Sequence, residues 1–184
     1  MIKMYIPQYE DMWFREKLLL DPETMSYNNA WGGIIEFPES KWQAWYNNWI
    51  KNPQKERFYR YLFDENDNFI GEIAYHLENN IYLANIIIYS KYRGRGYGRE
   101  GLDLLCRQAK KNGLKYLHDN IALDNSAIKL FLEHGFVEEY RTNEIIMLKK
   151  TLWYYNLVKI LLILSSNHKK VWVFLLLFCW LMCL

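Results

Sequence analysis

The sequence predicts a mixed sheet domain of the α/β or α+β class. Three observations predict it: strand-like and helix-like segments both recur along residues 1–150, the middle of this region contains consecutive strands joined by a tight turn, and its later part alternates strand and helix. A chain of 184 residues with 51% apolar side chains is long enough for one such domain and too apolar to be disordered.

The N-terminal third is expected to contain a short strand and two helices. A strand fits residues 1–6, and helical spacing over 7–20 ends at Asp21-Pro22, because the residue before a proline disfavours helical geometry. Residues 32–37 fit a short strand or an extended loop. A second helix is expected over 39–51, where aromatic side chains recur at i, i+3, i+4 and i+7: Trp42, Trp45, Tyr46 and Trp49. This spacing is typical of a buried helix face.

The middle of the domain is expected to be antiparallel. Residues 58–63 and 69–76 predict two strands joined by a polar turn, and residues 81–89 predict a mostly apolar strand that is buried on both faces. The remaining elements are a helix, a strand, a helix and a closing hairpin, in the order 99–112, 115–118, 126–134, 136–140 and 144–149.

The last 34 residues differ from the rest of the chain. All 21 acidic residues and 20 of the 23 basic ones lie in residues 1–150, which carry a net charge of −1, whereas residues 151–184 carry +3 and are mostly apolar. Their two apolar runs, 152–164 and 171–184, are each shorter than the roughly 20 residues that span a bilayer. We therefore expect two parts: a folded domain over 1–150 and a hydrophobic C-terminal tail over 151–184.

Three interpretations of the tail stay open. It fits a weak membrane or interfacial anchor over 152–184, a contact with a partner or with a second copy in a homodimer, or an extension without selected function. A cytoplasmic protein is expected, with membrane association only if the tail is an anchor. Three cysteines without paired spacing indicate a reduced intracellular compartment. The net charge of +2 predicts no nucleic-acid partner, and the histidine and cysteine spacing predicts no metal site.

A glycine-rich segment follows the apolar strand 81–89. Three glycines and three arginines fall within residues 93–99, directly before the helix 99–112. Glycines let successive backbone N–H groups converge, and the dipole of the following helix favours negative charge. A plain tight turn with solvated arginines does not account for this density of both residue types. We therefore expect a phosphorylated ligand here.

Two common phosphate motifs do not explain the segment. The nucleotide-triphosphate loop is absent. The dinucleotide fingerprint Gly-x-Gly-x-x-Gly does occur at 96–101, with Asp119 about 20 residues later. That fold needs several further strand–helix units, and only 31 residues of the domain follow Asp119. A dinucleotide-binding fold is therefore excluded.

Two segments resemble signatures of the GNAT acetyltransferase superfamily. Arg93-x-x-Gly96-x-Gly98 resembles its Arg/Gln-x-x-Gly-x-Gly/Ala motif, and residues 125–136 resemble its second signature, an Asn, a short helix and Gly-Phe before a strand. The resemblance covers residues 57–150 well and the preceding part only in general pattern. It implies a mostly antiparallel sheet flanked by helices, in which the central strands 81–89 and 115–118 splay apart.

The resemblance also implies acetyl-CoA as the cosubstrate. Its pantetheine arm would lie in the splay against the backbone of 86–88, and its pyrophosphate would lie on the amides of 94–99. The cofactor-binding residues implied in this way are Ile86, Ile87, Ile88, Arg93, Gly94, Arg95, Gly96, Tyr97, Gly98, Arg99, Asn125 and Phe131. A backbone N–H near Ile88 would polarise the thioester carbonyl and hold the oxyanion.

Proton transfer needs a base, because an amine is protonated at neutral pH. Many family members carry a Glu early on the strand before the loop, and the equivalent position here holds Tyr82. Glu72 on the neighbouring strand is our candidate for the catalytic base, with a solvent-facing structural carboxylate as the alternative. Three further groups stand behind it: His76, Glu78 and Asp119. Many members also use a Tyr to protonate the departing thiolate, at a position where this chain has Phe131.

The acceptor is expected to contact the N-terminal third of the chain. Aromatic rings there can stack on a cationic amine, and carboxylates can attract it. Trp31 and Glu36 are the candidate acceptor residues. We therefore predict an acetyl-CoA-dependent N-acetyltransferase acting on a primary amine of a small molecule, peptide or protein. The alternatives are a non-catalytic acyl-CoA-binding regulatory module and a membrane-associated protein that uses the tail.

Overall fold

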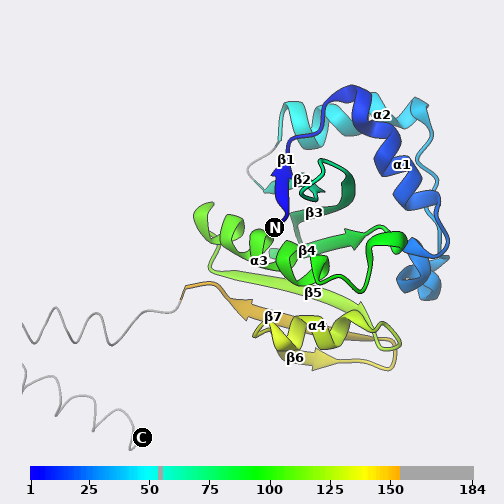
Figure 1. Ribbon diagram of the computed structural model, residues 1–184. Helices are drawn as coiled ribbons and strands as arrows, with labels where there is room; N and C mark the ends of the chain where they lie inside the picture. Colours follow the sequence, from blue (N-terminus) through cyan, green and yellow to red (C-terminus); the bar gives the residue numbers. More distant parts are fainter. Residues whose placement is uncertain (54–55, 154–184) are drawn as a thin grey trace, which may run out of the picture. The chain divides into compact units, whose positions relative to one another are not determined.

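Seven strands form one sheet in the computed structural model, which describes residues 1–53 and 56–153 (Figure 1). The order is β1-β2-β3-β4-β5-β7-β6, and neighbouring strands are antiparallel except β4 and β5, which are parallel. The strands are β1 (Lys3–Tyr5), β2 (Arg57–Phe63), β3 (Phe69–Glu78), β4 (Ile81–Ile88), β5 (Tyr116–Ala122), β6 (Val137–Arg141) and β7 (Ile145–Thr151). The mixed, mostly antiparallel sheet confirms the predicted fold class.

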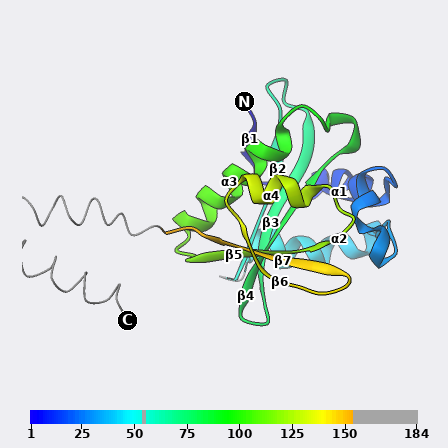
Figure 2. The same ribbon diagram turned by 90° about the horizontal axis from the view of Figure 1, so that it is seen from below.

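Helices cover both faces of this sheet (Figure 2). One face carries α3 (Tyr97–Lys111) and α4 (Ala127–Glu133), and the other carries α1 (Met12–Leu20) and α2 (Glu39–Tyr46). Four short helical segments lie between these elements: η1 (Tyr9–Asp11), η2 (Thr24–Trp31), η3 (Asn47–Lys51) and η4 (Ser90–Tyr92). The sheet is therefore the middle layer of three.

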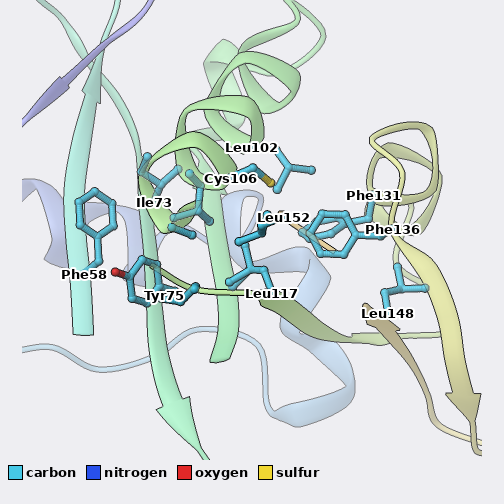
Figure 3. Close-up of a cluster of buried hydrophobic side chains, with 14 of the residues drawn as sticks. Phe58, Ile73, Tyr75, Leu102, Cys106, Leu117, Phe131, Phe136, Leu148 and Leu152 are labelled. Atoms are coloured by element: carbon cyan, nitrogen blue, oxygen red, sulfur yellow. The ribbon is translucent and has the colours of Figure 1, made fainter. Parts of the chain in front are cut away.

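Side-chain alternation along the strands divides the core into two clusters. On β3, Ile73 and Tyr75 join the cluster under α3 and α4, whereas Ala74 joins the cluster under α1 and α2. Figure 3 shows the first cluster, in which Phe131 of α4 lies beside Phe136 with ring centroids 4.9 Å apart. Burial on both faces explains why the central strands are largely apolar.

α2 continues directly into the π-helical turn η3, and together they cover the helix predicted over 39–51. Its aromatic side chains pack against the cluster under α1 and α2, which confirms their structural role. Residues 32–37 form bends and extended chain rather than a strand. The strand predicted over 115–118 extends to Ala122, where it pairs with Ile145 of β7.

The compact unit of the structure is Met1–Leu152, two residues longer than the predicted domain. β7 continues to Thr151, and Leu152 is buried and donates its N–H to the carbonyl oxygen of Lys115 (2.9 Å). The predicted anchor, partner and homodimer contacts of the tail fall on residues outside the described part of the chain. Within the described residues, no helix is both long and apolar enough to cross a membrane.

Candidate active site

One large cleft, with a volume of about 690 Å³, lies where β4 and β5 separate. The two strands share a single paired position, Leu83 opposite His118, so they diverge from there toward the ends that carry Ile88 and Ala122. The glycine-rich turn after β4, α4 and η2 complete the walls. The predicted splay of the central strands is therefore present, and it forms this cleft.

The register between β3 and β4 decides which backbone groups of β4 face the cleft. Gly71 lies opposite Ile88, and the N–H of Tyr89 donates to the carbonyl oxygen of Ile70 (3.0 Å) just outside this pair. This pattern makes Gly71 and Ile88 a non-hydrogen-bonded pair. The backbone N–H and C=O of Ile88 therefore point away from β3, toward the splay.

The same alternation separates Ile86 from Ile87. Ile86, two residues before Ile88, also directs its backbone groups into the splay, whereas Ile87 lies opposite Glu72 and bonds to β3. This corrects the prediction that the backbone of all three isoleucines is free for pantetheine. A Cβ at Gly71 would lie 2.2 Å from the carbonyl oxygen of Ile87, so this close approach of the two strands requires glycine.

The glycine-rich turn is built around two left-handed residues. Gly94 has φ +75° and Gly96 has φ +84°, a region that side chains other than glycine rarely adopt. Gly96 is the residue before α3, which then runs for 15 residues from Tyr97. The first N–H groups of a helix have no partner within it, and their dipole is positive. An anion in the cleft would meet these groups.

Gly101, the third glycine of the apparent dinucleotide fingerprint at 96–101, has a packing role. A Cβ at this position would lie 2.9 Å from Cδ1 of Ile86 and 3.0 Å from Cδ1 of Leu62. The glycine therefore lets α3 approach β2 and β4 closely and has no ligand role.

The three arginines of the turn have different partners. Arg93 lines the cleft, but its guanidinium donates to the backbone carbonyls of Ile88 (3.2 Å), Glu23 (3.0 Å) and Thr24. The guanidinium carbon of Arg95 lies 5.6 Å from the ring centroid of Tyr92, and Arg99 pairs with Glu133 of α4 (2.5 Å). Arg95 and Arg99 do not line the cleft, so their predicted cofactor contact stays a prediction about their backbone amides.

The second signature reaches the cleft through Asn125 and Phe131. Oδ1 of Asn125 accepts the N–H of Ala127 (2.8 Å), so this side chain holds the start of α4. Phe131 is buried, packs on Phe136 and lines the cleft with an apolar ring. Gly94, Tyr97 and Gly98 also line the cleft, whereas Gly96 shapes the turn from outside it.

The structure contradicts the role of Glu72 as the base. Its side chain is buried, pairs with the guanidinium of Arg15 and accepts the hydroxyl of Tyr59. It does not line the cleft. The guanidinium carbon of Arg15 also lies 4.5 Å from the ring centroid of Trp45 on α2. Glu72 is therefore a structural carboxylate that fastens α1 to the sheet, and it is buried rather than facing solvent.

The carboxyl group best placed in the cleft is Asp119 of β5. Burial raises its pKa to about 8, partly opposed by a hydrogen bond from the backbone of Asn120. His76 and Glu78 at the end of β3 also line the cleft and contact each other (Nε2 to Oε2, 3.2 Å). The raised pKa of Asp119 makes it the candidate for proton transfer among these groups.

The acceptor residues predicted from the sequence are only partly brought together. Trp31 lines the cleft from η2 and is 49% exposed. Glu36 is exposed and does not line the cleft, which contradicts its predicted role. Tyr27, which sequence reasoning missed, lines the cleft one helical turn before Trp31, and burial raises its pKa. No motif marks η2, and only its aromatic residues hint at a binding surface.

Comparison with known proteins agrees with this geometry. The model of the acetyltransferase (GNAT) family matches residues 15–136. The chain belongs to the GNAT acetyltransferase family. This confirms the predicted family, whose members are acetyltransferases that use acetyl-CoA as the cosubstrate.

One curated relative of this GNAT chain is a protein-modifying enzyme. The chain is 34% identical over 90 residues to the [ribosomal protein bS18]-alanine N-acetyltransferase of Haemophilus influenzae, a match over 48% of this chain and 62% of that protein. The chain therefore matches less than two thirds of the length of this curated relative.

Solved structures show the same fold. The spermidine N-acetyltransferase of Vibrio cholerae, solved with CoA and spermine, is 20% identical, with a TM-score of 0.65 over 82% of this chain and 95% of that one. An N-acetyltransferase of Staphylococcus aureus Mu50 is 16% identical, with a TM-score of 0.68 over 83% and 99%. At these identities the likeness establishes the fold of this GNAT protein and not its acceptor.

Proposed function

We propose that this protein transfers the acetyl group of acetyl-CoA to a primary amine. The observation that carries the proposal is the continuity of one cleft, which joins the free backbone of β4, the glycine-rich turn and Asp119. A helix N-terminus and glycines suit a pyrophosphate, and strand backbone without a neighbour suits the amides of pantetheine.

The residues present fit acetyl-CoA. Ile86 and Ile88 offer backbone groups along the splay, and Gly94 and the first turn of α3 offer N–H groups at its wide end. Gly98 leaves room for α4, since a Cβ there would lie 3.3 Å from Cδ2 of Leu130. In the proposed complex the N–H of Ile88 holds the thioester oxygen as negative charge develops on it.

Asp119 is the proposed base, in place of Glu72. Its carboxylate takes one proton from the ammonium form of the acceptor, and the neutral amine attacks the thioester carbon. The attacking nitrogen then loses a second proton to solvent, and the carbon–sulfur bond breaks to leave the amide and the thiolate. A carboxyl with a pKa of about 8 is well matched to this task near neutral pH. His76 and Glu78 lie along the same cleft and supply a polar route for the proton toward solvent.

The family position that often holds a phenol carries Phe131, so α4 supplies no proton to the leaving thiolate. A thiol has a pKa of about 8.5, so the thiolate is a fair leaving group and can take its proton from solvent. Turnover is therefore possible without the phenol.

The proposed acceptor is a cationic amine of a small molecule, peptide or protein. Trp31 and Tyr27 present aromatic rings on one side of the cleft, and Glu78 and Asp119 present carboxyl groups on the other. The relatives suggest two classes for testing, polyamines and protein N-termini. A non-catalytic acyl-CoA-binding module is the second candidate, favoured by the missing phenol at Phe131.

Thiol release from acetyl-CoA tests the proposal. The full chain is incubated with acetyl-CoA and a panel containing spermidine, diamines and peptides with an N-terminal alanine, and the acetylated product is identified by mass spectrometry. We expect release of thiol that depends on an amine and matches the acetylated product in amount. Binding of acetyl-CoA without turnover on any amine would favour the non-catalytic module.

A further inference from the structure

The short helix η2 is fastened to the end of β4 by a set of hydrogen bonds that sequence reasoning did not predict. Nε of Arg93 donates to the carbonyl of Ile88, and its two terminal nitrogens donate to the carbonyls of Glu23 and Thr24. One guanidinium thus joins the last residue of β4 to the first turn of η2, about 70 residues away in the chain. Figure 1 shows η2, in blue, beside the green turn between β4 and α3.

Two further residues complete this connection. The N–H of Ser90 donates to Oγ1 of Thr24 (2.9 Å), and its hydroxyl donates to Oδ2 of Asp21 (2.9 Å). The same Asp21 oxygen accepts the N–H of Thr24 (2.8 Å). Thr24 is fully buried, so the bonds made by its own N–H and hydroxyl are costly to leave unmade. We call this set, formed by Asp21, Thr24, Ser90 and Arg93, the η2 lock.

The lock holds the wall of the cleft that faces Asp119. Beyond Thr24, η2 presents Tyr27, Asn28 and Trp31 to the cleft. Met25 also anchors η2, because its side chain is buried in the cluster under α1 and α2. The lock is the set of hydrogen bonds that joins η2 directly to the end of β4, so the position of these side chains relative to Ile88 depends on it.

We infer that Arg93 is a positioning residue for the amine acceptor, and that its side chain does not bind the pyrophosphate of acetyl-CoA. Its guanidinium donates to three backbone carbonyls, through Nε and both terminal nitrogens. These bonds use three of its five N–H groups and hold the guanidinium against the start of η2. The lock instead ties the acceptor wall to the strand that holds the thioester, so both substrates meet at a fixed separation. This inference rests on the proposed function.

A shortened acyl donor separates the two roles of Arg93. Acetyl-pantetheine carries the thioester and the pantetheine amides but lacks the pyrophosphate and the nucleotide. For Arg93→Gln, we expect the KM for the active amine of the panel to rise about tenfold or more, the change that one lost charged hydrogen bond produces. The increase should be the same with acetyl-CoA and with acetyl-pantetheine, and the Kd for CoA should change little.

Thr24→Val is the second variant, because it removes the acceptor of the Ser90 N–H without altering any residue of the glycine-rich turn. It should raise the KM for the amine by the same factor whether the acyl donor is acetyl-CoA or acetyl-pantetheine. Arg141→Gln is the matched control: Arg141 pairs with Glu138 within β6 (2.9 Å), outside the cleft, and both constants should stay at wild-type values.

Amide hydrogen exchange tests the η2 lock independently of enzyme activity. In the full chain, Arg93→Gln and Thr24→Val should speed amide exchange across residues 27–31, whereas exchange within α3 and in Arg141→Gln stays as in wild type. Unchanged exchange at 27–31 in both variants would overturn the inference. So would a rise in the Kd for CoA together with a defect that disappears with acetyl-pantetheine, since that result makes Arg93 a pyrophosphate ligand. A wild-type protein without turnover would refute the proposed function and leave the exchange test standing.

Discussion

Two carboxyl groups on central strands of one sheet lie in opposite environments in this protein. Glu72 is surrounded by partners, the guanidinium of Arg15 and the hydroxyl of Tyr59, and it faces away from the cleft. Asp119 lines the cleft with little to stabilise its charge, and burial raises its pKa. The environment of each residue, and not its type, therefore decides which one can exchange a proton.

Asp119→Asn is expected to lower turnover at neutral pH by about 10²-fold or more, because general bases typically contribute a factor of that size. In the wild type the rate should rise with pH through about 8, as Asp119 becomes ionised. The variant should lose this rise. Asp124→Asn, a second carboxyl of the cleft wall, is the control and should keep it. An unchanged pH–rate profile in Asp119→Asn would remove Asp119 from the base role.

The same substitution is expected to stabilise the fold at high pH. The pKa of Asp119 rises from 3.8 to about 8 on folding, so the unfolded chain loses this proton first and stability falls as pH rises between these values. Asp119→Asn removes that cost. Melting temperatures measured at pH 5 and pH 9 should show a smaller loss in the variant than in the wild type. Parallel losses would show that Asp119 is not desolvated.

Sequence reasoning ranked these residues in the wrong order for a physical reason. The pattern of β3 does not show that Arg15, 57 residues earlier, reaches Glu72. Asp119 was among the predicted alternatives, but its desolvation depends on η2 and β4, which only the fold brings beside it. Residues that act through their own backbone, such as Gly94 and Gly96, were predictable because their motif directly specifies a local conformation.

At the scale of elements, the turn between β4 and α3 is expected to depend on left-handed glycine. Gly96→Val introduces a β-branched residue at φ +84° with nothing within 4 Å of the new Cβ, so the effect is backbone strain alone. We expect the Kd for CoA to rise about tenfold or more while the fold is retained, as measured by calorimetry and circular dichroism.

Gly113→Val supplies the matched control. Gly113 follows the other end of α3, has φ +88° and likewise has nothing within 4 Å of a new Cβ. The two variants therefore share the strain and differ in their distance from the cleft. Equal CoA affinity in both would contradict the assignment of the turn to the pyrophosphate.

The strands and main helices were predictable because their apolar periodicity is local, whereas η2 was not. An eight-residue 3₁₀ helix has neither a long apolar stripe nor a phosphate motif, and its position is set by bonds to Ser90 and Arg93 far along the chain. The register that frees the backbone of Ile86 and Ile88 was equally hidden. It depends on which pair of β3 and β4 is hydrogen-bonded, and side-chain patterns do not encode this choice.

At the scale of the whole molecule, we predict that the folded unit needs the chain as far as Leu152. A chain ending after residue 150 removes the last position of β7 and the buried side chain of Leu152, whereas a chain ending after residue 153 keeps both. Loss of a buried leucine typically costs about 2–5 kcal/mol. The shorter chain should therefore melt at a clearly lower temperature. Equal melting temperatures would show that Leu152 contributes nothing to the core.

The central claim is that the splay between β4 and β5 binds the acyl donor through backbone N–H groups. Nuclear magnetic resonance of the ¹⁵N-labelled full chain, titrated with CoA, observes those groups directly. We predict large amide shifts at Ile86, Ile88 and residues 94–99, and a smaller shift at Ile87, whose N–H already bonds to β3. Shifts confined to residues outside the cleft, or equal shifts at Ile87 and Ile88, would contradict the account.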